Sequence, residues 1–329
     1  MADIRLDYEN EFPIQIEAPD ISAYKSGNIG VDYIHTFDSG KEGPHIFISA
    51  VVHGNEPCGA IALDWLFKKD LRPVKGKLSL GFMNVEAYLA YDPNNPNRTR
   101  WIDEDFNRLW GPGILDDFSR LKTSEFERAR IVRPIINDAD FLLDIHSMQK
   151  PCVPLMMAGM KAKGLTFAKL VGMNIATISD SGHKEGMRMR DFSDFSDPNS
   201  KKNALLVECG QHWEKSSETI AIETAIRFIK STGIMNDEFG MEYLSNSKND
   251  DQISFYKVGE IITIKTEKFK FSKDWQGFDN LDKGTIIAYD DEEPIYAPFE
   301  KTILIMPTKR LLVGKTAVRL AYEIEQYGL

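Results

Sequence analysis

The sequence has little cysteine, no excess of basic residues and no long apolar run. Its three cysteines in 329 residues are an odd number, which excludes a framework of disulfides and fits a reducing compartment. Its 40 Lys and Arg against 50 Asp and Glu give a net charge of −10. That balance argues against nucleic acid and anionic membrane surfaces as partners, since both attract basic proteins.

Targeting and membrane signals are missing as well. No stretch reaches the roughly 18 uncharged apolar residues that a membrane-spanning helix needs. The chain starts Met-Ala-Asp-Ile-Arg-Leu-Asp, without the basic start and apolar run of a signal peptide. We therefore expect a cytoplasmic protein with no membrane partner. The sequence leaves open whether the chain forms a homo-oligomer.

What the sequence does contain is the composition of a globular protein. Hydrophobic residues make up 42% and aromatic residues 11% of the chain, which excludes disorder. The length predicts one large domain or two unequal ones. A small acidic substrate remains compatible with the net charge, because a pocket can be locally basic on an acidic protein.

Strand and helix patterns alternate through the first two thirds of the chain. The apolar run Ile46 to Val52 is typical of a central strand covered on both faces. Further strands are expected at 78–85, 141–145 and 203–207, with a helix over 123–136. This alternation predicts an α/β fold with a mixed, largely parallel sheet covered by helices on both faces.

The pattern changes near residue 240. A polar break at 245–251 is followed by short predicted strands separated by turn residues, at 261–264, 285–289, 301–306 and 316–321. We therefore expect an α/β domain over 1–244 and a small β-rich domain over 245–329.

A candidate metal site follows the first central strand, in His53-Gly54-Asn55-Glu56. A histidine and a glutamate three residues apart on a turn can aim at one point, and zinc accepts both ligand types. A catalytic zinc takes a third protein ligand, for which His146 at the end of another apolar strand is the candidate. The alternative for each residue alone is an ordinary hydrogen-bonded side chain.

Two further segments carry candidate catalytic groups. Glu208 ends an apolar strand, where burial can raise the pKa of a carboxyl group toward that of a working base; a helix cap is the alternative. Arg100 and Arg108 lie in a long loop, and guanidinium groups bind carboxylates and stabilise oxyanions. A network of surface ion pairs is the alternative for both arginines.

Together these segments resemble one family. The sequences at 53–56, 100–108, 144–146 and 207–210, in this order, are similar to the succinylglutamate desuccinylase/aspartoacylase family, whose members are zinc-dependent amidohydrolases related to the zinc carboxypeptidases. The similarity runs from about residue 45 to 215 and implies a zinc carboxypeptidase-like fold. It also implies that the α/β domain over 1–244 is catalytic and that the β-rich domain over 245–329 shapes the pocket entrance.

The resemblance implies a role for each matching residue. His53, Glu56 and His146 would hold one Zn²⁺ per chain. Glu208 would take a proton from the attacking water, and Arg100 would stabilise the oxyanion. The carboxylate of the amino-acid part of the substrate would be bound by Asn107 and Arg108.

The sequence also departs from the family pattern. Members acting on dicarboxylic substrates have an arginine about ten residues before the catalytic glutamate. Residues 193–207 of this chain contain no arginine, and their only basic residues are Lys201 and Lys202. Arg188 and Arg190 lie further back, so recognition of a second carboxylate is left open. The family's pocket tyrosine has two candidates here, Tyr289 and Tyr296.

The sequence therefore predicts a zinc-dependent deacylase that cleaves the amide bond of an N-acyl amino acid or a related small molecule carrying a carboxylate. Whether the enzyme also hydrolyses ester bonds is left open. Two alternatives remain: a zinc carboxypeptidase acting on peptides, and a non-catalytic zinc-binding protein on the same fold.

Overall fold

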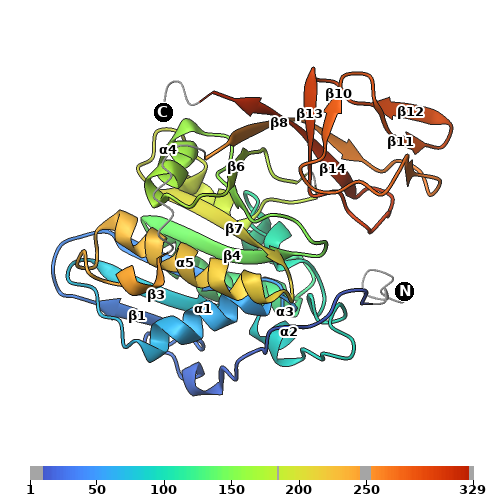
Figure 1. Cartoon of the computed structure of the whole chain (residues 1–329). Coiled ribbons are helices and arrows are strands. Elements are labelled where there is room, and N and C mark those ends of the chain that lie inside the picture. The colour runs from blue at the N-terminus through green and yellow to red at the C-terminus, as the bar shows by residue number, and fades with distance from the viewer. Residues whose placement is uncertain (1–9, 184, 245–252, 326–329) are drawn as a thin grey trace.

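One sheet of eleven strands runs through the chain, in the order β1-β3-β2-β4-β7-β5-β6-β8-β14-β13-β10 (Figure 1). The computed structural model describes residues 10–183, 185–244 and 253–325. Within these residues, no helix is both long enough and apolar enough to cross a membrane.

The strands of the first two thirds are β1 (Ile34–Asp38), β2 (His45–Ala50), β3 (Lys77–Phe82), β4 (Phe141–Met148), β5 (Leu155–Met157), β6 (Ala176–Ser179) and β7 (Asn203–Gln211). The helices are α1 (Pro57–Lys68), α2 (Val85–Leu89), α3 (Ser124–Asp138), α4 (Ala162–Val171) and α5 (Lys215–Thr232). The later strands are β8 (Phe255–Thr263), β9 (Lys270–Phe271), β10 (Asn280–Asp282), β11 (Ile286–Asp290), β12 (Glu293–Tyr296), β13 (Lys301–Ile305) and β14 (Thr316–Ile324).

The centre of the sheet is parallel. Strands β3, β2, β4 and β7 are neighbours and run in the same direction. Every residue of β2 and of β7 is buried, as their continuous apolar runs predict for strands covered on both faces. Antiparallel neighbours occur on both sides of this centre, so the predicted mixed, largely parallel α/β sheet is confirmed.

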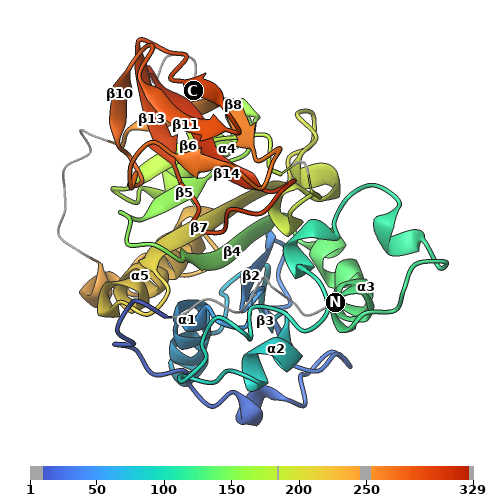
Figure 2. The same ribbon diagram turned by 90° about the vertical axis from the view of Figure 1, so that its right-hand side faces the viewer.

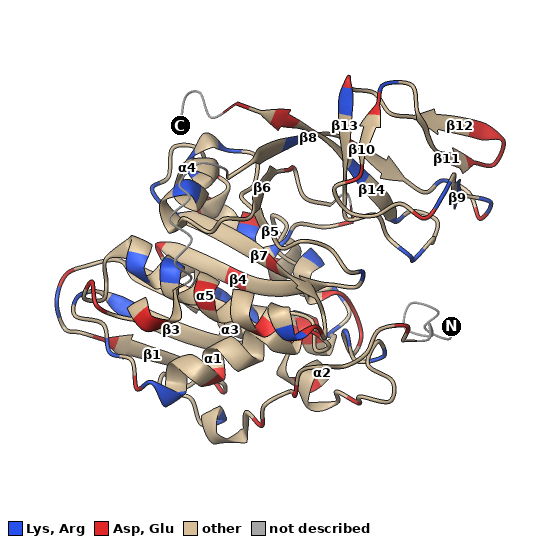
Figure 3. Ribbon diagram, in the orientation of Figure 1, with Lys and Arg blue, Asp and Glu red and all other residues tan. Residues whose placement is uncertain are grey.

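Helices cover both faces of this parallel centre. Apolar side chains of α1, α4 and α5 share one core with β2, β4 and β7, whereas α3 packs in a second core on the other face. Figure 2 shows α1 and α5 on one side of the central strands and α3 on the other. Charged residues of both signs lie mostly on the outer elements, while the central strands carry few (Figure 3).

The strands after residue 252 extend the same sheet. β8 pairs parallel with β6, and β14, β13 and β10 follow by antiparallel pairing. Strands β12, β11 and β9 form a separate small sheet, and this region has its own apolar core that includes Trp275, Ile287 and Leu304. The predicted domain boundary at 245 lies outside the described residues.

Candidate metal centre and active-site cavity

The candidate residues gather where three parallel strands end. His53 and Glu56 lie on the turn from β2 to α1, His146 lies near the end of β4, and Glu208 lies near the end of β7. Since β2, β4 and β7 are adjacent and parallel, their carboxyl ends meet at one edge of the sheet. The register places His146 directly beside Glu208.

Two local features fix the turn after β2. Val51 has a φ of 52°, which is a strained value for a β-branched residue and reverses the chain at the strand end. Gly54 is in a crowded position, because a Cβ there would lie 2.4 Å from the carbonyl oxygen of Thr99. The Gly54 N–H donates to the carbonyl of Arg100 at 3.0 Å, which joins the turn to the loop that carries this arginine.

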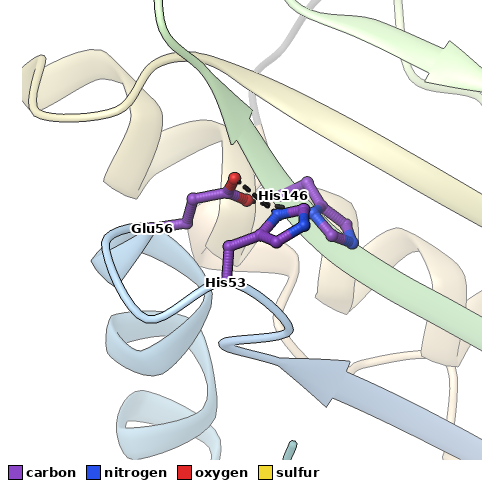
Figure 4. Close-up of side chains that lie close together, drawn as sticks. All are labelled: His53, Glu56 and His146. Carbon is purple, nitrogen blue, oxygen red and sulfur yellow. Dashed lines mark hydrogen bonds and ion pairs between the residues drawn. The ribbon is translucent and has the colours of Figure 1, made fainter. Parts of the chain in front are cut away.

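His53, Glu56 and His146 form a buried group that can hold a metal ion. One donor atom from each residue lies within 4.8 Å of the others. His53 Nδ1 lies 2.8 Å from Glu56 Oε1, and His146 Nδ1 lies 2.9 Å from Glu56 Oε2. Figure 4 shows the three side chains directed toward one another from the β2–α1 turn and from β4.

The second nitrogen of each histidine faces a carboxylate. His53 Nε2 lies 3.0 Å from Asp105 Oδ1, and His146 Nε2 lies 2.8 Å from Asp144 Oδ2. Asp144 also accepts a hydrogen bond from Ser49. Metal-ligating histidines characteristically donate their other N–H to a carboxylate, which leaves Nδ1 free to ligate. The donor set therefore fits a metal ion held by two Nδ1 atoms and one carboxylate.

The charges of this group depend on one another. Burial raises the pKa of Glu56, but the adjacent His53 and His146 outweigh it and hold the pKa well below its usual range. Burial lowers the pKa of His146, but the carboxylates of Asp144 and Glu56 outweigh burial and raise the pKa well above its usual value. Glu56 is therefore a carboxylate, as a metal ligand must be.

A cavity of about 620 Å³ opens beside the metal donors, and Glu208, Arg100 and Arg108 line it. Burial, with a contribution from Glu56, raises the pKa of Glu208 to about 8 although His146 and Arg100 oppose it. Its Oε2 is buried and has no hydrogen-bond partner among the residues that the structure describes. A raised pKa and a place in the cavity wall suit a carboxyl group that transfers protons, and Glu208 remains the predicted base.

Arg100 is held against the metal donors. Its Nη1 donates to Glu56 Oε1 at 2.9 Å, and its Nη2 lies 3.0 Å from His53 Nε2. The fully buried Glu125 fixes the adjoining loop by accepting the N–H groups of Ile102 and Asp103 at 2.7 and 3.1 Å. Arg100 therefore contacts two buried metal donors and is not part of a surface network of ion pairs.

Arg108 and Asn107 are placed differently from each other. Arg108 lines the cavity, and its Nε is buried with no hydrogen-bond partner in the described part of the chain. Asn107 is buried, its Oδ1 accepts the N–H of Met189 at 2.8 Å, and it is not among the residues that line the cavity. Tyr289 and Tyr296 are not among them either.

Sequence reasoning did not name the individual residues that the C-terminal region contributes to the cavity wall. They lie between residues 277 and 319 and are Gly277, Met306, Pro307, Thr308, Arg310, Leu312, Lys315, Thr316 and Arg319. His212 also lines the cavity, and its Nδ1 lies 2.8 Å from Ser147 Oγ. No short motif in the sequence marks these positions.

The wall is basic although the protein is acidic. Seven Lys or Arg residues line the cavity against five Asp or Glu residues, in a chain with a net charge of −10. The cavity therefore favours an anionic ligand, as the locally basic pocket inferred from the sequence requires.

Comparisons with known proteins point to one family and one fold. The succinylglutamate desuccinylase from Pseudoalteromonas atlantica is 24% identical over 305 residues, which cover 84% of this chain and 81% of that protein. The solved structure of the succinylglutamate desuccinylase from Vibrio parahaemolyticus matches with a TM-score of 0.64 at 16% identity, covering 89% of this chain and 87% of that one. A product-bound ectoine utilization protein from Ruegeria pomeroyi matches with a TM-score of 0.59 at 16% identity, over 89% and 88% of the two chains.

The family model of the succinylglutamate desuccinylase/aspartoacylase catalytic domain matches residues 42–252, which include all the predicted metal donors and Glu208. Because this match covers more than half of the 329 residues, the chain belongs to the succinylglutamate desuccinylase/aspartoacylase family.

Proposed function

We propose that the chain is a zinc-dependent hydrolase that cleaves the amide bond of an N-acyl amino acid or a related small molecule. Membership of the family indicates a deacylase. The observation that carries the proposal is a group of three metal donors beside one cavity, whose wall also holds a buried glutamate and two arginines.

Zinc is the metal we propose for His53, Glu56 and His146. Two imidazole nitrogens and one carboxylate are a ligand set of catalytic zinc sites, which keep a further position open. When bound, zinc would polarise a carbonyl oxygen and lower the pKa of a water molecule.

The remaining chemistry belongs to the side chains. Glu208 Oε2 accepts a proton from the attacking water and then delivers it to the departing amine. The Arg100 guanidinium donates hydrogen bonds to the oxyanion that develops on the carbonyl. Its ion pair with Glu56 holds it at the metal donors before the substrate arrives, so little reorganisation is needed.

Arg108 binds the carboxylate of the amino-acid part. Its ion pairs with Asp105 and Glu185 are long, at 3.7 and 3.8 Å, so hydrogen-bonding capacity remains for a ligand. Asn107 stays a predicted contact; its bond to Met189 holds the turn from which Arg108 projects. The division into a catalytic domain over 1–244 and a β-rich domain over 245–329 remains part of this proposal.

The test is a screen of the zinc-loaded protein against N-acyl amino acids and against dipeptides with a blocked amino terminus. We expect turnover of N-acyl amino acids and metal analysis that gives one zinc per chain. Turnover of peptides alone would favour the carboxypeptidase, and zinc binding without any turnover would favour the non-catalytic alternative.

A further inference from the structure

Arg319 is a buried guanidinium in the cavity wall that none of the proposed reaction steps uses. It lies on β14, lines the cavity and is only 3% exposed. It lies close enough to Glu208 and Arg108 for their charges to act on it. A buried arginine at such a place needs partners for its five N–H groups.

The partners of Arg319 leave part of this requirement unmet. Its Nη2 lies 2.8 Å from Nε2 and 3.1 Å from Nδ1 of His183. Its Nε lies 3.5 Å from Asp180 Oδ2 but makes no hydrogen bond, and Nη1 makes none with the described residues.

The charge of Arg319 is also incompletely balanced. Its single carboxylate partner among the described residues is Asp180, which already accepts two hydrogen bonds from Arg188 at 2.6 and 3.1 Å. Burial and the neighbouring arginines lower the pKa of His183 well below its usual range, so this imidazole is neutral and adds no opposing negative charge. An anion in the cavity would supply the missing charge and acceptor atoms.

The other basic residues considered from the sequence are engaged elsewhere. Arg188 is engaged in ion pairs with Asp180 and Asp191, and it does not line this cavity. Arg190 donates to the carbonyls of Ala158 and Ala204 and faces a neighbouring cavity. Lys201 and Lys202 do not line this cavity either.

We propose that Arg319 binds a second carboxylate of the substrate, separate from the one bound by Arg108. The chain would then act on N-acyl amino acids that carry two carboxylates, with the second on the acyl group or on the amino-acid side chain. This inference rests on the proposed deacylase function. It means that a residue of β14, in the C-terminal region, determines which N-acyl amino acids the enzyme prefers.

The test compares three substrates in the wild-type protein and in Arg319→Met. One is an amino acid with a neutral side chain whose acyl group carries a carboxylate, one is an N-acetyl amino acid with an acidic side chain, and one is an N-acetyl amino acid with a neutral side chain. We expect one of the two substrates with a second carboxylate to lose about 100-fold in kcat/KM, since its charged group loses a buried fork-shaped partner, while the substrate without a second carboxylate changes little. The substrate that loses more identifies which part carries the second carboxylate.

Lys315→Gln is the matched control, because Lys315 lines the same cavity but is paired with Glu185 at 3.0 Å. An equal loss in both variants, or an unchanged preference in Arg319→Met, would overturn the assignment. Binding of succinate and of its monoamide, measured by calorimetry, tests Arg319 independently of turnover: only the wild type should prefer succinate. If the wild type hydrolyses none of the substrates, the deacylase proposal fails while the calorimetric result still decides the role of Arg319.

Discussion

The candidate metal centre and the C-terminal wall of the adjacent cavity are assembled in different ways. His53, Glu56, His146 and Glu208 lie at the ends of adjacent parallel strands, so the parallel register alone brings them together. Arg319 reaches the cavity from β14, an antiparallel strand four places beyond β7 in the sheet. The proposed reacting groups thus depend on one compact strand edge, and the proposed substrate selection depends on how distant strands extend the sheet.

The strongest test of this difference is Glu208→Gln. Because a general base contributes about 10²- to 10⁴-fold, we expect kcat to fall by about 10³-fold for every substrate, with metal content unchanged. Activity assays together with metal analysis measure both quantities. The control is Glu214→Gln, six residues further on and outside the cavity wall. Wild-type turnover in Glu208→Gln would contradict the mechanism.

The outcome for these two regions shows what the sequence predicts well. The metal donors are predictable because each sits at the end of an apolar run, and an α/β sheet brings such ends together. Arg319 is not predictable in this way, because the direction of its side chain depends on how β14 pairs with β8 and that ladder changes register on both sides of Arg319. Neither irregularity has a signal in the local sequence.

A second test concerns Arg100. Arg100→Met removes a donor to the developing oxyanion, and such donors contribute about 10²- to 10³-fold. We expect kcat to fall by about 100-fold while KM changes less, because the oxyanion exists only in the transition state. Steady-state kinetics measure the two constants. The exposed Arg98, two residues earlier in the same loop, provides the control Arg98→Met. A pure rise in KM would instead assign Arg100 to substrate binding.

A third test concerns the carboxylate behind His146. Asp144→Asn keeps the shape of the side chain but weakens the hydrogen bond that orients His146. We expect metal affinity to fall by about 10- to 100-fold, as for other outer partners of metal ligands. Competition with a chelator measures this loss. Asp140→Asn, at the opposite end of β4, is the control, and equal affinity in wild type and Asp144→Asn would contradict the orienting role of Asp144.

The smallest expected effect lies in the C-terminal region, where Asp290 ties two strand ends together. Its carboxylate accepts hydrogen bonds from Lys265 N and Thr266 N at 2.7 and 3.0 Å, and from Thr266 Oγ1 at 2.7 Å. Burial raises the pKa of Asp290, but the hydrogen bonds from Thr266 and Lys265 outweigh it and the pKa is lowered. A lowered folded-state pKa means that ionised Asp290 stabilises the fold above its unfolded pKa of about 3.9, and that this stabilisation is lost as the pH falls through the folded value.

Asp290→Asn should therefore lower the free energy of unfolding by about 1–3 kcal/mol at neutral pH, since it weakens bonds to a buried carboxylate. Urea denaturation at several pH values measures the difference from wild type, which should be constant above about pH 5 and shrink below it. Turnover of the folded variant should change little, because Asp290 does not line the cavity. A large loss of kcat in the folded variant would show that the C-terminal strands control the reacting groups as well as the cavity wall, and the contrast between the two regions would then be wrong.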